Sequence, residues 1–175
     1  MKSPLRLDNI PTFLVMQERQ SPPFPIELFW LDLNNLKATL DAVRAIYADL
    51  AQRPVQRDCL RRTECCQFKL TGRTPHLTRG EALLAAHGFR ASGRKTLPNL
   101  TDGSCPFLQP KTQKCLIYES RPLGCRTHFC QAAGGPMDRK DVLDLIRRLE
   151  PIDANLDGDG SHSLPQAVDW ALENS

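Results

Sequence analysis

A stripe of apolar residues between positions 33 and 50 predicts the clearest helix of the chain. Its members recur at alternating steps of three and four residues: Leu33, Leu36, Leu40, Val43, Tyr47 and Leu50. This spacing places them on one face of an α-helix. We expect Asp32 or Asn34 to cap its start and Pro54 to end it. Because the stripe covers only about two and a half heptads, it favours a core-packing helix over a coiled-coil seam.

A second helix is predicted from a capping box, Thr78-Arg79-Gly80-Glu81, followed by an apolar run from Leu83 to Ala86. Gly88 is its expected stop, since glycine is common just after a helix end.

Two more helices are predicted near the C-terminus. The first runs from Asp138, its cap, to Leu149, and closes at Pro151. Its expected buried face consists of Val142, Leu145, Ile146 and Leu149. The second covers Leu164 to Leu172, with Ser163 as cap and Pro165 in its first turn.

Between these helices, the stretch from Leu97 to Pro136 has little periodicity and is rich in Cys, Pro and Gly. Cys105-Pro-Phe-Leu and Cys115-Leu-Ile-Tyr are predicted to form two short strands joined by the polar loop from Gln109 to Lys114. A stretch of about forty residues without regular elements is uncommon inside a compact domain. Metal–thiolate bonds would order it, because metal-binding energy then becomes folding energy.

The pattern therefore predicts one mainly α domain over residues 1–175, with helices flanking an irregular Cys-rich metal-bound core and one short β-hairpin. We expect an extended arm over residues 1–30, in which Phe13, Leu14 and Val15 form a short strand or docking segment. The cysteine core is expected over residues 58–131 and the C-terminal helices over 138–175. A chain of 175 residues can bury a core without needing disulfides.

All seven cysteines lie between positions 59 and 130: Cys59, Cys65, Cys66, Cys105, Cys115, Cys125 and Cys130. The N-terminus lacks a signal-peptide h-region, and no apolar stretch approaches the ~20 residues of a membrane span. We therefore expect a cytoplasmic protein with reduced thiols and no membrane partner. An odd cysteine count also fits a disulfide frame badly, whereas clustered thiols are good soft-metal ligands.

The cysteine spacing lacks the CxxC knuckles typical of zinc fingers. Adjacent side chains diverge, so we expect that Cys65 and Cys66 do not both reach one small ion. Ser120-Arg121-Pro122 is predicted to begin a helical turn that carries Cys125, and its free N–H groups and dipole would favour a negative cluster. Arg121 and Arg126 are candidate cofactor-binding residues, because hydrogen bonds to cluster sulfurs tune affinity and potential.

These residues resemble the YkgJ-type cysteine-cluster family, described as a zinc- or iron-chelating domain. The match lies in Cys59, in Cys65-Cys66, in Cys105-Pro-Phe-Leu, in Cys115-Leu-Ile-Tyr-Glu-Ser-Arg-Pro and in Cys125-Arg-x-x-x-Cys130, and it covers about residues 58–131. The resemblance implies that the seven cysteines bind zinc or iron. The family usually has eight cysteines, and its second one falls here at about Arg62. His128 or His76 is a candidate replacement, with His128 as the eighth predicted ligand and both His76 and His87 less favoured.

The choice of metal stays open between zinc and iron. Four thiolates suit either a closed zinc site or a [4Fe–4S] cluster. More than four cysteines without knuckle spacing favours the cluster. Apolar neighbours would wrap it: Phe107, Leu108, Leu116, Ile117 and Phe129.

The function follows the same division. A structural or redox role for the metal is the favoured interpretation. The alternative is an iron–sulfur-dependent modifying enzyme, since flagellin lysine methylases have a similar cysteine pattern. Metal storage or delivery is a third class. The sequence has no nucleotide loop, no glycine-rich cofactor fingerprint and no CxxxCxxC motif, and it identifies no catalytic residue, substrate or protein partner.

Two further features are assigned lesser roles. Between Arg53 and Thr96, ten Arg or Lys against three Asp or Glu give a charge of +7, while the whole chain carries +3. Compensation of thiolates explains this better than nucleic-acid binding, because aromatic interleaving is missing. Asp153 to Gly160 resembles the front of an EF-hand loop, but Leu164 stands where the twelfth-position acid is required. A solvated turn between helices is expected instead.

Overall fold

The computed structural model describes residues 26–54, 57–98 and 100–174, with side chains from Asn34 onward. The predicted arm over residues 1–25, including Phe13, Leu14 and Val15, lies outside this part of the chain.

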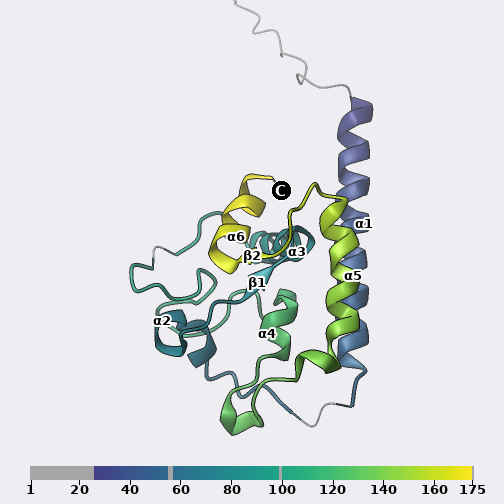
Figure 1. Cartoon of the computed structure of the whole chain (residues 1–175). Coiled ribbons are helices and arrows are strands. Elements are labelled where there is room, and N and C mark those ends of the chain that lie inside the picture. The colour runs from purple at the N-terminus through teal and green to yellow at the C-terminus, as the bar shows by residue number, and fades with distance from the viewer. Residues whose placement is uncertain (1–25, 55–56, 99, 175) are drawn as a thin grey trace, which may run out of the picture.

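Four helices form the body of the molecule: α1 (Ile26–Ala51), α3 (Arg79–Ala91), α5 (Leu143–Ala154) and α6 (Leu164–Glu173). Helix α3 lies at the centre and packs against the other three. Figure 1 shows α1 and α5 side by side and antiparallel, with the first turns of α1 extending beyond α5. The prediction of a mainly α fold is confirmed. No helix in the described ranges is long and apolar enough to cross a membrane.

The apolar stripe of α1 forms part of the core, as predicted. Leu40, Val43, Tyr47 and Leu50 are buried, and Leu36 packs partly against them. The predicted helix start was wrong, because α1 begins at Ile26 and takes in the last five residues of the expected arm. Neither proline nor glycine interrupts residues 26–32, so the helix extends beyond the stripe that it buries.

Helix α3 begins with the predicted capping box at Thr78 and Glu81. It does not stop at Gly88, as predicted, but continues to Ala91 and buries Phe89. A Cβ at Gly88 would lie 2.3 Å from the Ser120 hydroxyl oxygen. This glycine is therefore needed for a close approach of chain segments and does not end the helix.

Helix α5 buries Leu145 and Leu149 as predicted, with Val142 buried just before it and Ile146 partly buried. Its predicted ends were both wrong. A 3₁₀ turn (Arg139–Asp141) follows Asp138, whose side chain makes no cap hydrogen bond, and α5 runs through Pro151 to Ala154. Pro151 is exposed, so water can reach the carbonyl that its ring leaves without a partner.

A two-stranded antiparallel sheet, β1 (His76–Leu77) with β2 (His162–Ser163), ties the start of α3 to the start of α6. Its register pairs His76 with Ser163 and Leu77 with His162. Helix α6 starts after Ser163 as predicted and has Pro165 in its first turn. The Ser163 hydroxyl donates to the Gln166 side chain instead of capping the helix.

The cysteine-rich part has only short elements. These are the 3₁₀ turn Glu64–Cys66, α2 (Phe68–Thr71), the 3₁₀ turn Tyr118–Ser120, α4 (Leu123–Thr127) and the 3₁₀ turn Gln131–Ala133. The predicted hairpin is reduced to one antiparallel bridge between Leu108 and Cys115, flanked by the bonds Gln109 N–H to Lys114 O (2.9 Å) and Leu116 N–H to Phe107 O (2.8 Å). The polar loop therefore joins paired segments too short to form strands.

Candidate metal centre

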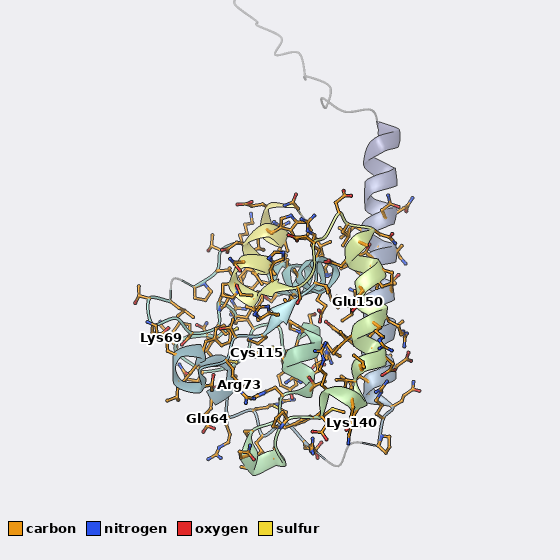
Figure 2. All side chains as sticks on the ribbon, viewed as in Figure 1. Glu64, Lys69, Arg73, Cys115, Lys140 and Glu150 are labelled. Carbon is orange, nitrogen blue, oxygen red and sulfur yellow. The ribbon has the colours of Figure 1, made fainter. Side chains whose placement is uncertain are left out.

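Six of the seven cysteines line one cavity of about 560 Å³: Cys59, Cys65, Cys66, Cys105, Cys115 and Cys125. All seven are free thiols, which excludes a disulfide frame. Figure 2 shows Cys115 and Arg73 in the space between α2 and α4. Lys140, in the turn before α5, and Glu150, on α5, lie away from them. Residues up to 66 positions apart in the sequence thus meet at one place.

Short local structures deliver these thiols to the cavity. Cys65 and Cys66 lie on the 3₁₀ turn, and the Cys105 N–H donates to the Cys66 carbonyl at 2.7 Å. Cys115 pairs with Leu108 in the isolated antiparallel bridge, and Cys125 lies in α4. Buried Phe107 and Ile117, two of the five residues expected to wrap a cluster, contribute apolar wall, whereas Leu108, Leu116 and Phe129 are not among the lining residues.

The thiols interact with one another. The Cys65 thiol donates to Cys66, and this hydrogen bond raises the pKa of Cys65. The Cys66 thiol donates to Cys105, which raises the pKa of Cys66 to about 12. Burial, and then the charges of Cys66, Cys115 and Cys65, raise the pKa of Cys125. Without a cation, the thiols of Cys65, Cys66 and Cys125 therefore keep their protons at neutral pH, and a bound metal would displace these protons.

The sequence predicts that Cys65 and Cys66 do not both reach one small ion, and this stays a prediction. Cys65 and Cys66 both line the cavity and their thiols contact each other. Both residues belong to the 3₁₀ turn Glu64–Cys66. Even so, within residues 26–54, 57–98 and 100–174, no three Cys, His, Asp or Glu side chains are placed to hold a single metal ion. The candidate ligands therefore line a cavity and do not converge on the position of one ion.

The two predicted cofactor-binding arginines have different environments. The Arg121 guanidinium lies 3.7 Å from the Cys59 sulfur and also donates to the Tyr118 carbonyl. Arg126 donates instead to the carbonyls of Arg121 (2.7 Å) and Glu119 and lies over the Tyr47 ring. Arg121 thus touches a cysteine sulfur, whereas Arg126 fixes the backbone that carries Arg121.

The remaining candidate ligands are divided between the cavity and its outside. His128 lines the cavity, and burial lowers its pKa, followed by the charge of Arg73. A neutral imidazole of this kind has a nitrogen lone pair for a metal. Cys130, His76 and His87 are not among the residues that line the cavity, and His87 is exposed on α3.

Glu81 has a second role that the capping box did not reveal. Its buried carboxylate accepts hydrogen bonds from the Thr78 N–H and hydroxyl (3.1 Å each), the Tyr47 hydroxyl (3.0 Å) and the Leu123 N–H (2.8 Å). Leu123 is the first residue of α4. This helix start was predicted at Ser120 and predicted to face the cluster, but its first N–H binds Glu81. Glu81 therefore holds the helix that carries Cys125 against α3.

The stretch with EF-hand character is largely the expected solvated turn, because Asn155, Asp157, Asp159 and Gly160 are exposed, but its first residue, Asp153, is buried. The Asp153 carboxylate accepts hydrogen bonds from the N–H groups of Arg79 (2.7 Å) and Gly160 (3.0 Å), and its side chain is only 3% exposed. Arg79 is the first residue of α3, so Asp153 stabilises that helix start.

Comparison with known proteins agrees with this geometry. Residues 58–143 match the family model CxxCxxCC, described as "Putative zinc- or iron-chelating domain". No curated protein and no solved structure gives a significant match. The matched segment contains all seven cysteines and confirms the predicted cysteine-cluster family. Over residues 58–143, just under half of its length, the chain is therefore similar to the CxxCxxCC family of cysteine domains.

Proposed function

We propose that the cavity holds a cysteine-ligated iron–sulfur cluster of the [4Fe–4S] type, with a structural or electron-transferring role. The observation that carries this proposal is the lining of one cavity by six free cysteines, more than the four thiolates that such a cluster takes.

The arrangement of the thiols favours a cluster over a single ion. Four thiolates on one zinc ion each lie about 2.3 Å from it, so their sulfurs must be close together. A cubane is larger, and its thiolate ligands stand farther apart around it. Sulfurs spread around about 560 Å³, with no three placed for one ion among the described residues, suit the larger group.

The surroundings support the same choice. Phe68, Phe107 and Ile117 give the cavity apolar walls, and Arg121 offers an N–H to the Cys59 sulfur. Burial and hydrogen bonds to sulfur are the features by which proteins tune cluster potential. When bound, the cluster supplies one-electron chemistry or cross-links the short elements around it.

Zinc is the second candidate, because four thiolates also form a closed zinc site and the matched family is described as zinc- or iron-chelating.

Anaerobic purification tests the proposal, with visible absorption and with iron, sulfide and zinc measured per chain. We expect a brown protein with a broad visible band and equal iron and sulfide. A colourless protein with stoichiometric zinc would replace the cluster by the zinc site. Absence of bound metal after supply of iron, sulfide and zinc would refute both.

A further inference from the structure

The wall of the cysteine cavity carries a surplus of positive charge. The described residues that line it include no Asp or Glu. They include five cationic side chains: Arg61, Arg62, Arg73, Lys114 and Arg121. Threonine hydroxyls and the Gln113 amide add polar groups at the same wall. Such a set attracts and hydrogen-bonds anions.

Two of these cations are held close to each other. Arg61 and Arg121 lie over the ring of Tyr118, at 4.3 and 3.7 Å from its centroid. Their guanidinium carbons are therefore no more than about 8 Å apart, a distance at which like charges repel inside a partly closed cavity. Arg61 also has a φ of 54°, a left-handed conformation uncommon for residues other than glycine.

A third cation stands where the family motif has a thiol. In the pattern CxxCxxCC, aligned on Cys59 and on Cys65-Cys66, the second cysteine position is Arg62. Arg62 lines the cavity and lies 3.7 Å from Glu64, in an exposed pair that solvent screens. At this position, this chain has a fixed positive charge in place of a potential ligand.

Thiolate compensation does not account for all five cations. A [4Fe–4S] cluster with four thiolates has a net charge of about −2 in its oxidised form. Among the described residues, the one cation with a hydrogen bond to a cysteine sulfur is Arg121. With the cluster bound, the cavity wall would thus keep a surplus of positive charge, provided by Arg61, Arg62, Arg73 and Lys114.

We propose that this wall is a binding site for a small oxyanion ligand, a molecule with a carboxylate or phosphate group held by the arginine forks next to the cysteines. The inference rests on the proposed function, because it places the ligand beside the proposed cluster. The whole cavity, which the ligand would share with the cluster, is about 560 Å³, within the usual size range of small-molecule sites. Guanidinium groups bind carboxylate and phosphate through two parallel N–H bonds.

Calorimetric titration of the full-length purified protein with inorganic phosphate and with citrate tests the site. We expect saturable binding of at least one of these probes, with a Kd below about 1 mM at low salt that weakens as salt rises. Arg73→Gln and Arg62→Gln should each weaken it about tenfold, since each removes charge-assisted hydrogen bonds. The matched control is Arg139→Gln, an exposed arginine of the turn before α5, and it should bind like the wild type.

Metal content of every variant separates this inference from the proposed function. Variants that keep the wild-type iron and sulfide but lose phosphate or citrate binding support the anion site. If the wild type binds no metal yet shows binding that Arg73→Gln weakens, the cluster fails and the anion site stands. No saturation by either probe, or equal weakening in Arg139→Gln, would overturn the inference. Tighter binding of single-stranded DNA that the same two substitutions weaken would also overturn it, in favour of a polymeric anion.

Discussion

The molecule consists of two regions that are stabilised in different ways. The helical frame, made of α1, α3, α5 and α6, has helices of ten or more residues that bury apolar faces against each other. The cysteine lobe, residues 59–75 and 100–130, contains α-helices of only four and five residues. Isolated helices that short are unstable, so the lobe depends on contacts made by side chains far apart in the sequence.

The lobe joins the frame at a few defined points. The Phe107 ring lies 5.7 Å from that of Phe89 in α3, and the Leu123 N–H binds Glu81 of the same helix. The stretch from Cys59 to Thr71 has one buried residue, Phe68. The comparison predicts that apolar burial stabilises the frame, whereas this stretch needs the metal that the cysteines are proposed to bind.

Metal removal should produce the largest difference between the two regions. In hydrogen exchange measured by mass spectrometry, chelation should speed exchange most in residues 59–71, because metal-binding energy is folding energy there. Helices α3 and α5 should keep their protection. Equal loss of protection in both regions would show that they fold as one unit.

Single cysteine substitutions sharpen the same comparison. Cys115→Ser and Cys125→Ser should lose bound metal and loosen the lobe, since both residues line the cavity. Cys130→Ser is the matched control and should retain metal, because Cys130 is not among the lining residues. Metal analysis of the three variants decides. Full metal in the first two, or loss in the third, would reassign the ligands.

A core truncation in the frame should lower stability without loss of bound metal. Leu145→Ala removes a fully buried side chain of α5 and should lower the free energy of unfolding by about 2–5 kcal/mol. The folded variant should still bind the wild-type amount of metal. Leu70→Ala, at a side chain that is 71% exposed, is the control and should change stability by less than about 0.5 kcal/mol in denaturant titrations.

Glu81→Gln should have a smaller effect, at the junction of the two regions. In this variant an NH₂ group would face N–H groups that now donate to the carboxylate. The lost hydrogen bonds should lower the free energy of unfolding by about 1–3 kcal/mol.

The pH dependence gives this variant a second readout. Burial raises the pKa of Glu81, so the folded protein retains this proton to higher pH than the unfolded chain. The stability that protonation contributes is complete below the unfolded pKa near 4.5 and is lost as pH rises through the folded value. Glu81→Gln should lack this component in stability measured between pH 4 and 7. An unchanged pH profile would show that Glu81 does not contribute it.

The sequence revealed what depends on local pattern. The stripe from Leu36 to Leu50, the capping box at Thr78 and the start of α6 at Ser163 were all predictable from spacing and cap chemistry. Helix ends at Gly88 and Pro151 were mispredicted because neither residue ends a helix here: Ser120 lies against Gly88 within α3, and α5 continues through an exposed proline.

The sequence predicted which residues belong to the candidate site, but not how they are arranged in space. Cysteine clustering identified the donors, yet spacing alone did not show that Cys65 and Cys66 share one cavity or that Cys130 is not in its lining. The roles of Glu81 and Asp153 depend on partners such as Leu123 and Gly160, which no local motif connects.

X-ray absorption at the metal edge of the anaerobically purified protein tests most directly whether these thiolates hold an inorganic centre. We predict an iron edge with a first shell made of sulfur alone and a second shell of neighbouring iron. A first shell of nitrogen and oxygen, at iron or at any other bound metal, would contradict the proposed role of the cysteine cavity.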